Sequence, residues 1–261
     1  MNILFIGDIV GRPGRHTVKA LLPKLKADYA IDFIIANGEN TAGGFGITKK
    51  LTEELLGSGI DVITTGNHVW ANKEVINFLG NEKMLLRPAN YPPEAPGEGS
   101  RVYQCQFGND VKVGVINLCG RTFMESLDCP FRVAIKEVDK ISAQTKIIVV
   151  DFHAEATSEK LAMGWFLDGK VSAVIGTHTH VQTADERISP NGTAYITDVG
   201  MTGPFDSILG LDKDLIIRRF LTQMPQKFEV ASGESILCGV YFQVNEQDGK
   251  AQKIVRIEEH L

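Results

Sequence analysis

Residues 3–8 read Ile-Leu-Phe-Ile-Gly-Asp, a short apolar run that ends at a glycine and a carboxylate. The pattern recurs, because further apolar runs of buried-strand length lie at residues 33–36, 62–64, 111–118, 147–150 and 173–175. Segments with helical patterns separate them, at residues 15–26, 48–56, 72–79, 131–143 and 158–167. This alternation predicts βαβ units that build a central sheet. Thr48 is of the right type to cap its helix, and Pro23 is expected to interrupt the first one.

After residue 192 the pattern changes towards strands. Candidate strands lie at residues 194–197, 236–244 and 252–257, with one helix expected around 212–221. These strands would complete a second sheet or a sheet edge, so the predicted class is α/β with mixed sheets. The loop at residues 87–99 holds four prolines and two glycines. We therefore expect a single domain over residues 1–261 with a small lid or cap segment around 87–131.

The composition excludes several classes of protein. The 261 residues are 43% hydrophobic and 23% charged, which excludes disorder, collagen and a coiled coil. Lys and Arg number 27 against 32 Asp and Glu, and no basic run is present, so extended nucleic-acid binding is not expected. The four cysteines include no Cys-x-x-Cys pair. No secretory signal and no membrane span is recognisable, so we expect a cytoplasmic protein.

Polar residues follow the apolar runs at five places: Gly7-Asp8, Asn37-Gly38-Glu39-Asn40, Gly66-Asn67-His68, Asp151-Phe152-His153 and Gly176-Thr177-His178-Thr179-His180. The carboxyl ends of parallel strands meet at one crevice, so these residues are expected to converge. Carboxylate, amide and imidazole ligands together suit Mn, Fe or Zn. The candidates outnumber the ligands of one ion, which favours two ions bridged by a carboxylate and hence phosphoryl chemistry.

Other interpretations of single residues stay open at this point. Asp8 taken alone fits a helix cap, and Asp151 and Glu155 compete with His153 as the ligand after their strand. The glycines around residues 7–14 and 43–46 fit tight turns better than a phosphate loop, because neither segment has a phosphate-binding fingerprint.

The ordered set of these motifs resembles the calcineurin-like metallophosphoesterases, most closely their YmdB-like bacterial branch. Residues 8–14, 37–46 and 198–204 also look like that branch, and the match covers nearly the whole chain. The resemblance implies a four-layered α/β/β/α sandwich. Two departures from the wider superfamily are shared with the branch: Asp8-Ile9-Val10 stands where most members have Asp-x-His, and Glu39 stands where most have a bridging Asp.

Carried over residue by residue, the resemblance implies two transition-metal ions, divalent or of mixed valence, with Fe or Mn ahead of Zn. It assigns the first ion to Asp8, Glu39, Asn40 and His180, and the second to Glu39, Asn67, His153 and His178. Glu39 is the implied bridge, and His68 the implied acid that protonates the leaving oxygen. The nucleophile would be a metal-bound hydroxide.

The resemblance further implies a phosphodiesterase acting on small phosphoesters, with 2′,3′-cyclic and 3′,5′-cyclic nucleotides as expected substrates, and is compatible with a homo-oligomer. Two other functions remain in view. A phosphomonoesterase of phosphoproteins or phospholipids would use the same centre. A nucleotide-sensing regulator would bind its ligand tightly and turn it over slowly.

Overall fold

The computed structural model describes residues 1–105 and 111–261, which form thirteen strands and six helices. Seven strands make the first sheet: β1 (Asn2–Ile6), β2 (Asp8–Ile9), β3 (Phe33–Asn37), β4 (Val62–Thr64), β11 (Met201–Pro204), β12 (Ser235–Val244) and β13 (Ala251–His260). Six make the second: β5 (Ser100–Gln104), β6 (Lys112–Cys119), β7 (Ile147–His153), β8 (Ala173–Thr177), β9 (Arg187–Ile188) and β10 (Ala194–Ile196). The helices are α1 (Gly11–Asp28), α2 (Lys49–Gly57), α3 (Val75–Phe78), α4 (Pro130–Ser142), α5 (Thr157–Phe166) and α6 (Lys213–Thr222).

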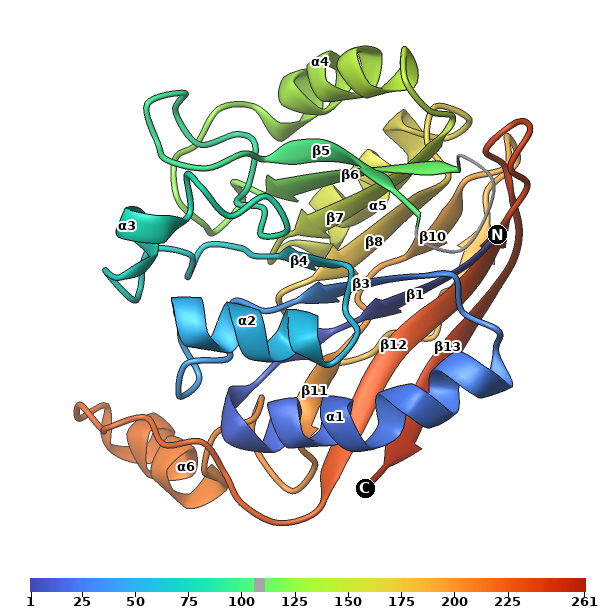
Figure 1. Ribbon diagram of the computed structural model, residues 1–261. Helices are drawn as coiled ribbons and strands as arrows, with labels where there is room; N and C mark the ends of the chain where they lie inside the picture. The colour runs from blue at the N-terminus through green and yellow to red at the C-terminus, as the bar shows by residue number, and fades with distance from the viewer. Residues whose placement is uncertain (106–110) are drawn as a thin grey trace.

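The two sheets stack between two layers of helices (Figure 1). The first runs in the order β2-β11-β12-β1-β3-β4, with β13 paired to β12, and the second in the order β5-β6-β7-β8-β10-β9. Both sheets are mixed: β1 is parallel to β3 and antiparallel to β12, while β6 is parallel to β7 and antiparallel to β5. The predicted four-layered sandwich is confirmed.

Strand alternation explains the layers. On β1, Ile3 and Phe5 belong to the core between the sheets, whereas Leu4 and Ile6 belong to the core under α1 and α2. Because successive side chains of a strand point to opposite faces, an uninterrupted apolar run such as β1 must be covered on both faces. A third core, which includes Phe152, lies under α4 and α5.

Two helices begin where the sequence predicts, and two helices differ from the prediction in their extent. Thr48 accepts a hydrogen bond from the Leu51 backbone N–H at 3.3 Å, as a cap of α2 should, and Asp212 caps α6 in the same way. The expectation for Pro23 was wrong, because α1 continues through it to Asp28. The helix predicted at residues 72–79 is shorter, since only Val75–Phe78 is helical.

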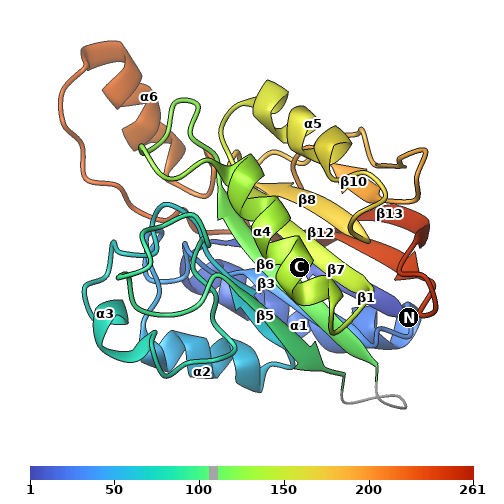
Figure 2. The same ribbon diagram turned by 90° about the horizontal axis from the view of Figure 1, so that it is seen from above.

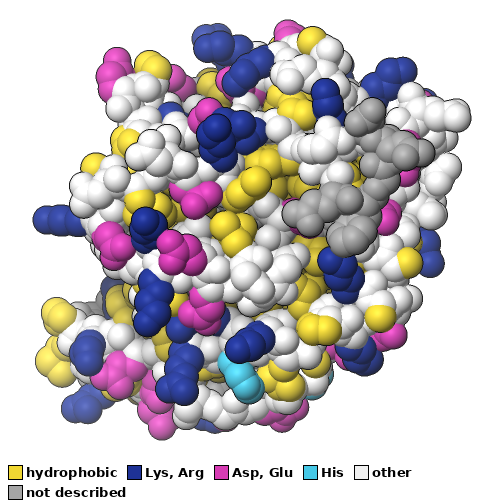
Figure 3. All heavy atoms as spheres, in the orientation of Figure 1, with side chains coloured by type: hydrophobic (Ala, Val, Ile, Leu, Met, Phe, Trp, Pro, Cys, Tyr) yellow, Lys and Arg dark blue, Asp and Glu magenta, His cyan; other side chains and the backbone are white. Residues whose placement is uncertain are grey.

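Helix α6 stands away from the layers in both ribbon views (Figures 1 and 2). Acidic and basic side chains are interspersed over the face drawn in Figure 3. Within residues 1–105 and 111–261, no helix has the length and apolar character needed to cross a membrane.

Candidate metal centre

The strand ends of both sheets meet at one place. Asp8 starts β2, Glu39 follows β3, and Asn67 lies beyond the end of β4, all from the first sheet. His153 ends β7, and the turn with His178 and His180 follows β8, both from the second sheet. The seven predicted ligands therefore gather around one centre: Asp8, Glu39, Asn40, Asn67, His153, His178 and His180.

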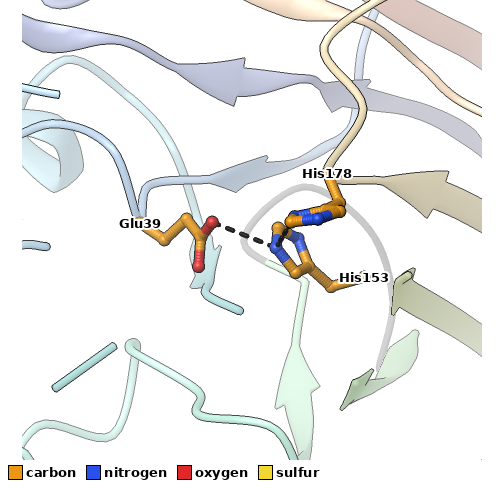
Figure 4. Close-up of side chains that lie close together, drawn as sticks. All are labelled: Glu39, His153 and His178. Carbon is orange, nitrogen blue, oxygen red and sulfur yellow. Dashed lines mark hydrogen bonds and ion pairs between the residues drawn. The ribbon is translucent and has the colours of Figure 1, made fainter. Parts of the chain in front are cut away.

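Glu39, His153 and His178 form the tightest group (Figure 4). The Nε2 atom of His153 lies 3.0 Å from Glu39 Oε1 and also 3.0 Å from His178 Nδ1. The Oδ1 atom of Asn67 is a third neighbour of the same nitrogen, at 3.0 Å. One imidazole nitrogen carries at most one proton and cannot satisfy three such partners. A cation held among these donor atoms would satisfy all of them, so the donor set fits a metal ion.

Asp8, Asn40 and His180 form a second group beside it. The Oδ1 atoms of Asp8 and Asn40 are buried and have no hydrogen-bond partner among the described residues. His180 Nε2 lies 3.8 Å from Asp8 Oδ1, while its Nδ1 lies 3.1 Å from the Leu209 carbonyl oxygen. A buried polar atom without a partner costs about 1–3 kcal/mol. Two such oxygens facing this centre fit the ligands of a second ion.

Burial and neighbouring charges shift the pKa values of several side chains at this centre. Burial raises the pKa of Asp8, although His180 and His153 oppose that effect. Burial also acts to raise the pKa of Glu39, but the adjacent His153 outweighs it and holds that pKa low. Burial and the charge of His153 lower the pKa of His178 to about 3. His178 thus keeps a free lone pair at neutral pH, which metal binding requires.

A buried carboxylate behind the centre orients His153. Thr177 Oγ1 lies 2.7 Å from Asp151 Oδ1, to which it donates, and 2.9 Å from His153 Nδ1. Because the Thr177 hydroxyl donates its hydrogen bond to Asp151, its oxygen accepts a hydrogen bond from the Nδ1–H of His153. Nδ1 therefore carries a proton whether or not the ring is charged, which leaves Nε2, the nitrogen that faces Glu39, as the atom that would bind an ion in place of its proton. Asp151 is therefore placed behind His153, and Glu155 is half-exposed, 3.1 Å from His178 Nε2.

A second buried pair holds the turn of residues 178–180 and was missed by the sequence analysis. Lys160, only 1% exposed, donates to Asp198 Oδ2 at 2.6 Å. The same oxygen accepts from the backbone N–H of Thr179 at 3.0 Å and from its hydroxyl at 2.7 Å. His178 and His180 flank Thr179 with φ of 98° and 64°, angles that strain a side-chain-bearing residue. Asp198 thus fixes the strained turn that presents both histidines.

A cavity of about 250 Å³ opens above these residues. Its polar lining comprises Glu39, Asn40, His68, Glu155, His178, Thr179 and His180, and its apolar lining Val10, Gly44, Phe45, Leu209 and Leu211. The backbone N–H of His68 donates to Glu39 Oε2 at 3.0 Å, so His68 adjoins the carboxylate predicted to bridge the ions and lines the same cavity. The cavity can admit a small ligand to the donor atoms.

A two-sheet sandwich with Asp, Glu, Asn and His donors gathered at the strand ends defines a metallophosphoesterase. Comparison with known proteins narrows this class. The chain belongs to the YmdB-like protein family, whose profile matches residues 4–257. The predicted family is thereby confirmed.

Individual relatives are similar to this chain over nearly its full length. The chain is 54% identical to a 2′,3′-cyclic-nucleotide 2′-phosphodiesterase of Bacillus subtilis over 98% of this chain and 96% of that protein. It is 38% identical to a protein of Mycoplasma pneumoniae described as a putative phosphatase/phosphodiesterase, over 99% and 92% of the two chains. The structure of a hypothetical protein from Thermus thermophilus superposes with a TM-score of 0.92 at 39% identity, over 100% of this chain and 99% of that one.

Proposed function

We propose that this protein is a dinuclear metal-dependent phosphodiesterase that hydrolyses small phosphoesters, with 2′,3′-cyclic nucleotides as its leading substrates. The observation that carries the proposal is the presence of two donor groups at one centre, Glu39 with His153 and His178, and Asp8 with His180. The name of the Bacillus subtilis relative supports the choice of substrate. Supporting it further, the buried unpartnered oxygens of Asp8 and Asn40 face the same centre.

In this proposal Asp8, Asn40 and His180 hold one ion, Asn67, His153 and His178 hold the other, and Glu39 bridges them. Bound ions would activate water at neutral pH and neutralise charge on the phosphoryl oxygens. The chain itself contributes His68, whose imidazole lines the cavity next to Glu39 and is the proposed donor of a proton to the departing ribose oxygen. We further propose that the ions are Fe or Mn and that the protein acts in the cytoplasm.

Metal content tests the centre. The wild-type protein, Glu39→Ala and the control Glu53→Ala on the exposed side of α2 are each incubated with Mn²⁺ or Fe²⁺, desalted and analysed by mass spectrometry. We expect about two ions per chain in the wild type and the control, and loss of at least one in Glu39→Ala. A Glu39→Ala protein that keeps both ions would contradict the bridging role.

Two esters test His68. Hydrolysis of a cyclic nucleotide releases a ribose alkoxide, a poor leaving group that needs a proton from an acid. Hydrolysis of bis(p-nitrophenyl) phosphate releases a stable phenolate that needs no acid. We expect His68→Ala to lower kcat by roughly 10²- to 10⁴-fold for 2′,3′-cyclic AMP and far less for the nitrophenyl ester. Equal losses on both esters would mean that His68 positions the phosphate.

A panel of ligands separates this function from the alternatives. The metal-loaded protein is assayed with 2′,3′-cyclic AMP, 3′,5′-cyclic AMP and p-nitrophenyl phosphate. Preference for a cyclic diester supports the proposal, and preference for the monoester identifies a phosphomonoesterase. Tight binding of a cyclic nucleotide with a slow kcat would identify a nucleotide sensor.

A further inference from the structure

The apolar residues that line the active-site cavity have no part in the chemistry proposed above. Phe45, Leu209 and Leu211 line it together with Val10 and the backbone of Gly44. Several proposed metal ligands and the proposed acid His68 line the same cavity. A ligand whose phosphate lies at these groups therefore has its remaining atoms within reach of hydrocarbon side chains.

Phe45 is held beside the catalytic groups by an unusual loop. Gly43, Gly44 and Gly46 have φ of 68°, 101° and 78°, which favour glycine, so three glycines surround this one aromatic residue. At Gly46 a Cβ would lie 2.8 Å from the Asn72 backbone nitrogen, so the loop also packs closely on the next segment.

The same loop connects Phe45 to a predicted metal ligand. The side-chain amide of Asn40 donates to the Gly44 carbonyl at 2.9 Å, and the Ala42 N–H donates to the Gly46 carbonyl at 2.9 Å. The Phe45 ring meets the His68 ring edge to face, with centroids 5.0 Å apart. The ring is therefore fixed relative to both the centre and the proposed acid.

A second aromatic residue supports Phe45. The Phe228 ring centroid lies 5.7 Å from the Phe45 ring centroid. The Phe228 ring also contacts the Arg219 guanidinium, which lies 4.8 Å from its centroid. The segment with Phe228 is bound to the segment before α6, because Asp212 N–H donates to the Glu229 carbonyl and Ala231 N–H to the Gly210 carbonyl, at 2.9 and 3.0 Å. The contacts with the His68 and Phe228 rings thus keep Phe45 half-buried at the cavity.

We propose that Phe45, with Leu209 and Leu211, forms a nucleobase subsite that takes purines and pyrimidines alike. The inference rests on the proposed function, since it assigns the base of a cyclic nucleotide to the apolar lining of the cavity. Every nucleobase has a flat face that packs on an aromatic ring, and such packing does not read the base. These three side chains carry no hydrogen-bonding group that could select one base edge.

Removing the base tests the subsite directly. The substrates are 2′,3′-cyclic AMP, 2′,3′-cyclic CMP and glycerol 1,2-cyclic phosphate, which keeps the five-membered cyclic diester and lacks a base. The proteins are the wild type, Phe45→Ala, Phe45→Leu and the control Phe166→Ala on α5, whose ring packs on Phe131 outside the cavity. Phe45→Leu keeps an apolar side chain and guards against a folding defect, which thermal melting checks for each variant.

We expect the wild type to use both nucleotides with kcat/KM within about tenfold of each other. In Phe45→Ala, the ratio of kcat/KM for a nucleotide to that for the glycerol ester should fall by about 5- to 150-fold, mainly through KM, with a smaller fall in Phe45→Leu. A hundredfold preference for one base, an unchanged ratio, or equal losses on all three substrates would overturn the subsite.

Binding distinguishes failure of the subsite from failure of the proposed function. If the wild type hydrolyses none of the three diesters, the phosphodiesterase function fails. Calorimetry with adenosine 3′-monophosphate then still decides the subsite: weaker binding to Phe45→Ala than to Phe166→Ala supports it, and equal binding overturns it.

Discussion

Replacing Lys160 by Met should destabilise the protein far more than its place on a helix suggests. Lys160 is 1% exposed and bound at 2.6 Å to Asp198, which is fully buried. Removing one partner of a buried ion pair costs about 3–5 kcal/mol, because the other charge is left uncompensated. Asp198 would keep the hydrogen bonds from Thr179 and Gly200, so the lower end of that range, about 3 kcal/mol, is expected.

The assay is thermal unfolding of the metal-free protein. A loss of about 3 kcal/mol lowers Tm by about 6–12 °C in a chain of this size. The matched control is Lys213→Met, which removes an exposed ion pair with Asp206 and should barely change Tm. The double variant Lys160→Met/Asp198→Asn removes both buried charges, and its Tm should lie above that of Lys160→Met.

The same variant tests the link to the histidine turn. If Asp198 and Lys160 together fix the turn of residues 178–180, Lys160→Met should also bind Mn²⁺ more weakly in calorimetry. Equal Tm values for the Lys160 and Lys213 variants, or a double variant less stable than the single one, would refute the reasoning about the buried pair.

Three further perturbations follow from the contacts described. Thr177→Val removes the hydroxyl that accepts the Nδ1 proton of His153, so Mn²⁺ affinity measured by calorimetry should fall about 10- to 100-fold, and unchanged affinity would mean that the hydroxyl does not orient the ring. Gly176→Ala places a Cβ 1.7 Å from a backbone oxygen and should abolish soluble expression, so a folded Gly176→Ala protein would contradict the close approach. The control Gly57→Ala, which has open space around it on α2, should have a Tm equal to or higher than that of the wild type. Backbone hydrogen bonds lower the pKa of Cys129, so its alkylation by iodoacetamide should rise with pH earlier than that of an ordinary thiol, while buried Cys119, whose pKa is raised, stays unmodified; peptide mass spectrometry reads both.

The strand ends could be predicted because two independent patterns coincide there. An apolar run of strand length followed by Asp, Asn or His marks both the fold and the donor atoms, as at residues 3–8 and 147–153. The order of these motifs then identified the family, and the structure brings all seven proposed ligands to one centre.

The supporting contacts could not be predicted because they depend on tertiary packing. Lys160 stands in a helical pattern where a lysine is ordinarily solvated, and only the sheet behind α5 buries it against Asp198. Phe45 lies in a glycine-rich loop whose sequence indicates only a tight turn. No sequence pattern near Phe45 predicts its contact with Phe228, which lies far along the chain. Pro23 is accommodated inside α1 against its usual preference.

The pairing of β1 with β12 has a consequence for biosynthesis. β1 is flanked by β3 on one edge and by β12 on the other, so β1 needs residues 235–244, which are synthesised much later, as its neighbour. At synthesis rates of about 5–20 residues per second, one edge of β1 waits roughly 10–50 s for that partner. The second sheet, whose strands lie between residues 100 and 196, is complete in sequence well before then. Nascent chains should therefore depend on chaperones that shield the apolar β1 until residues 235–244 are made.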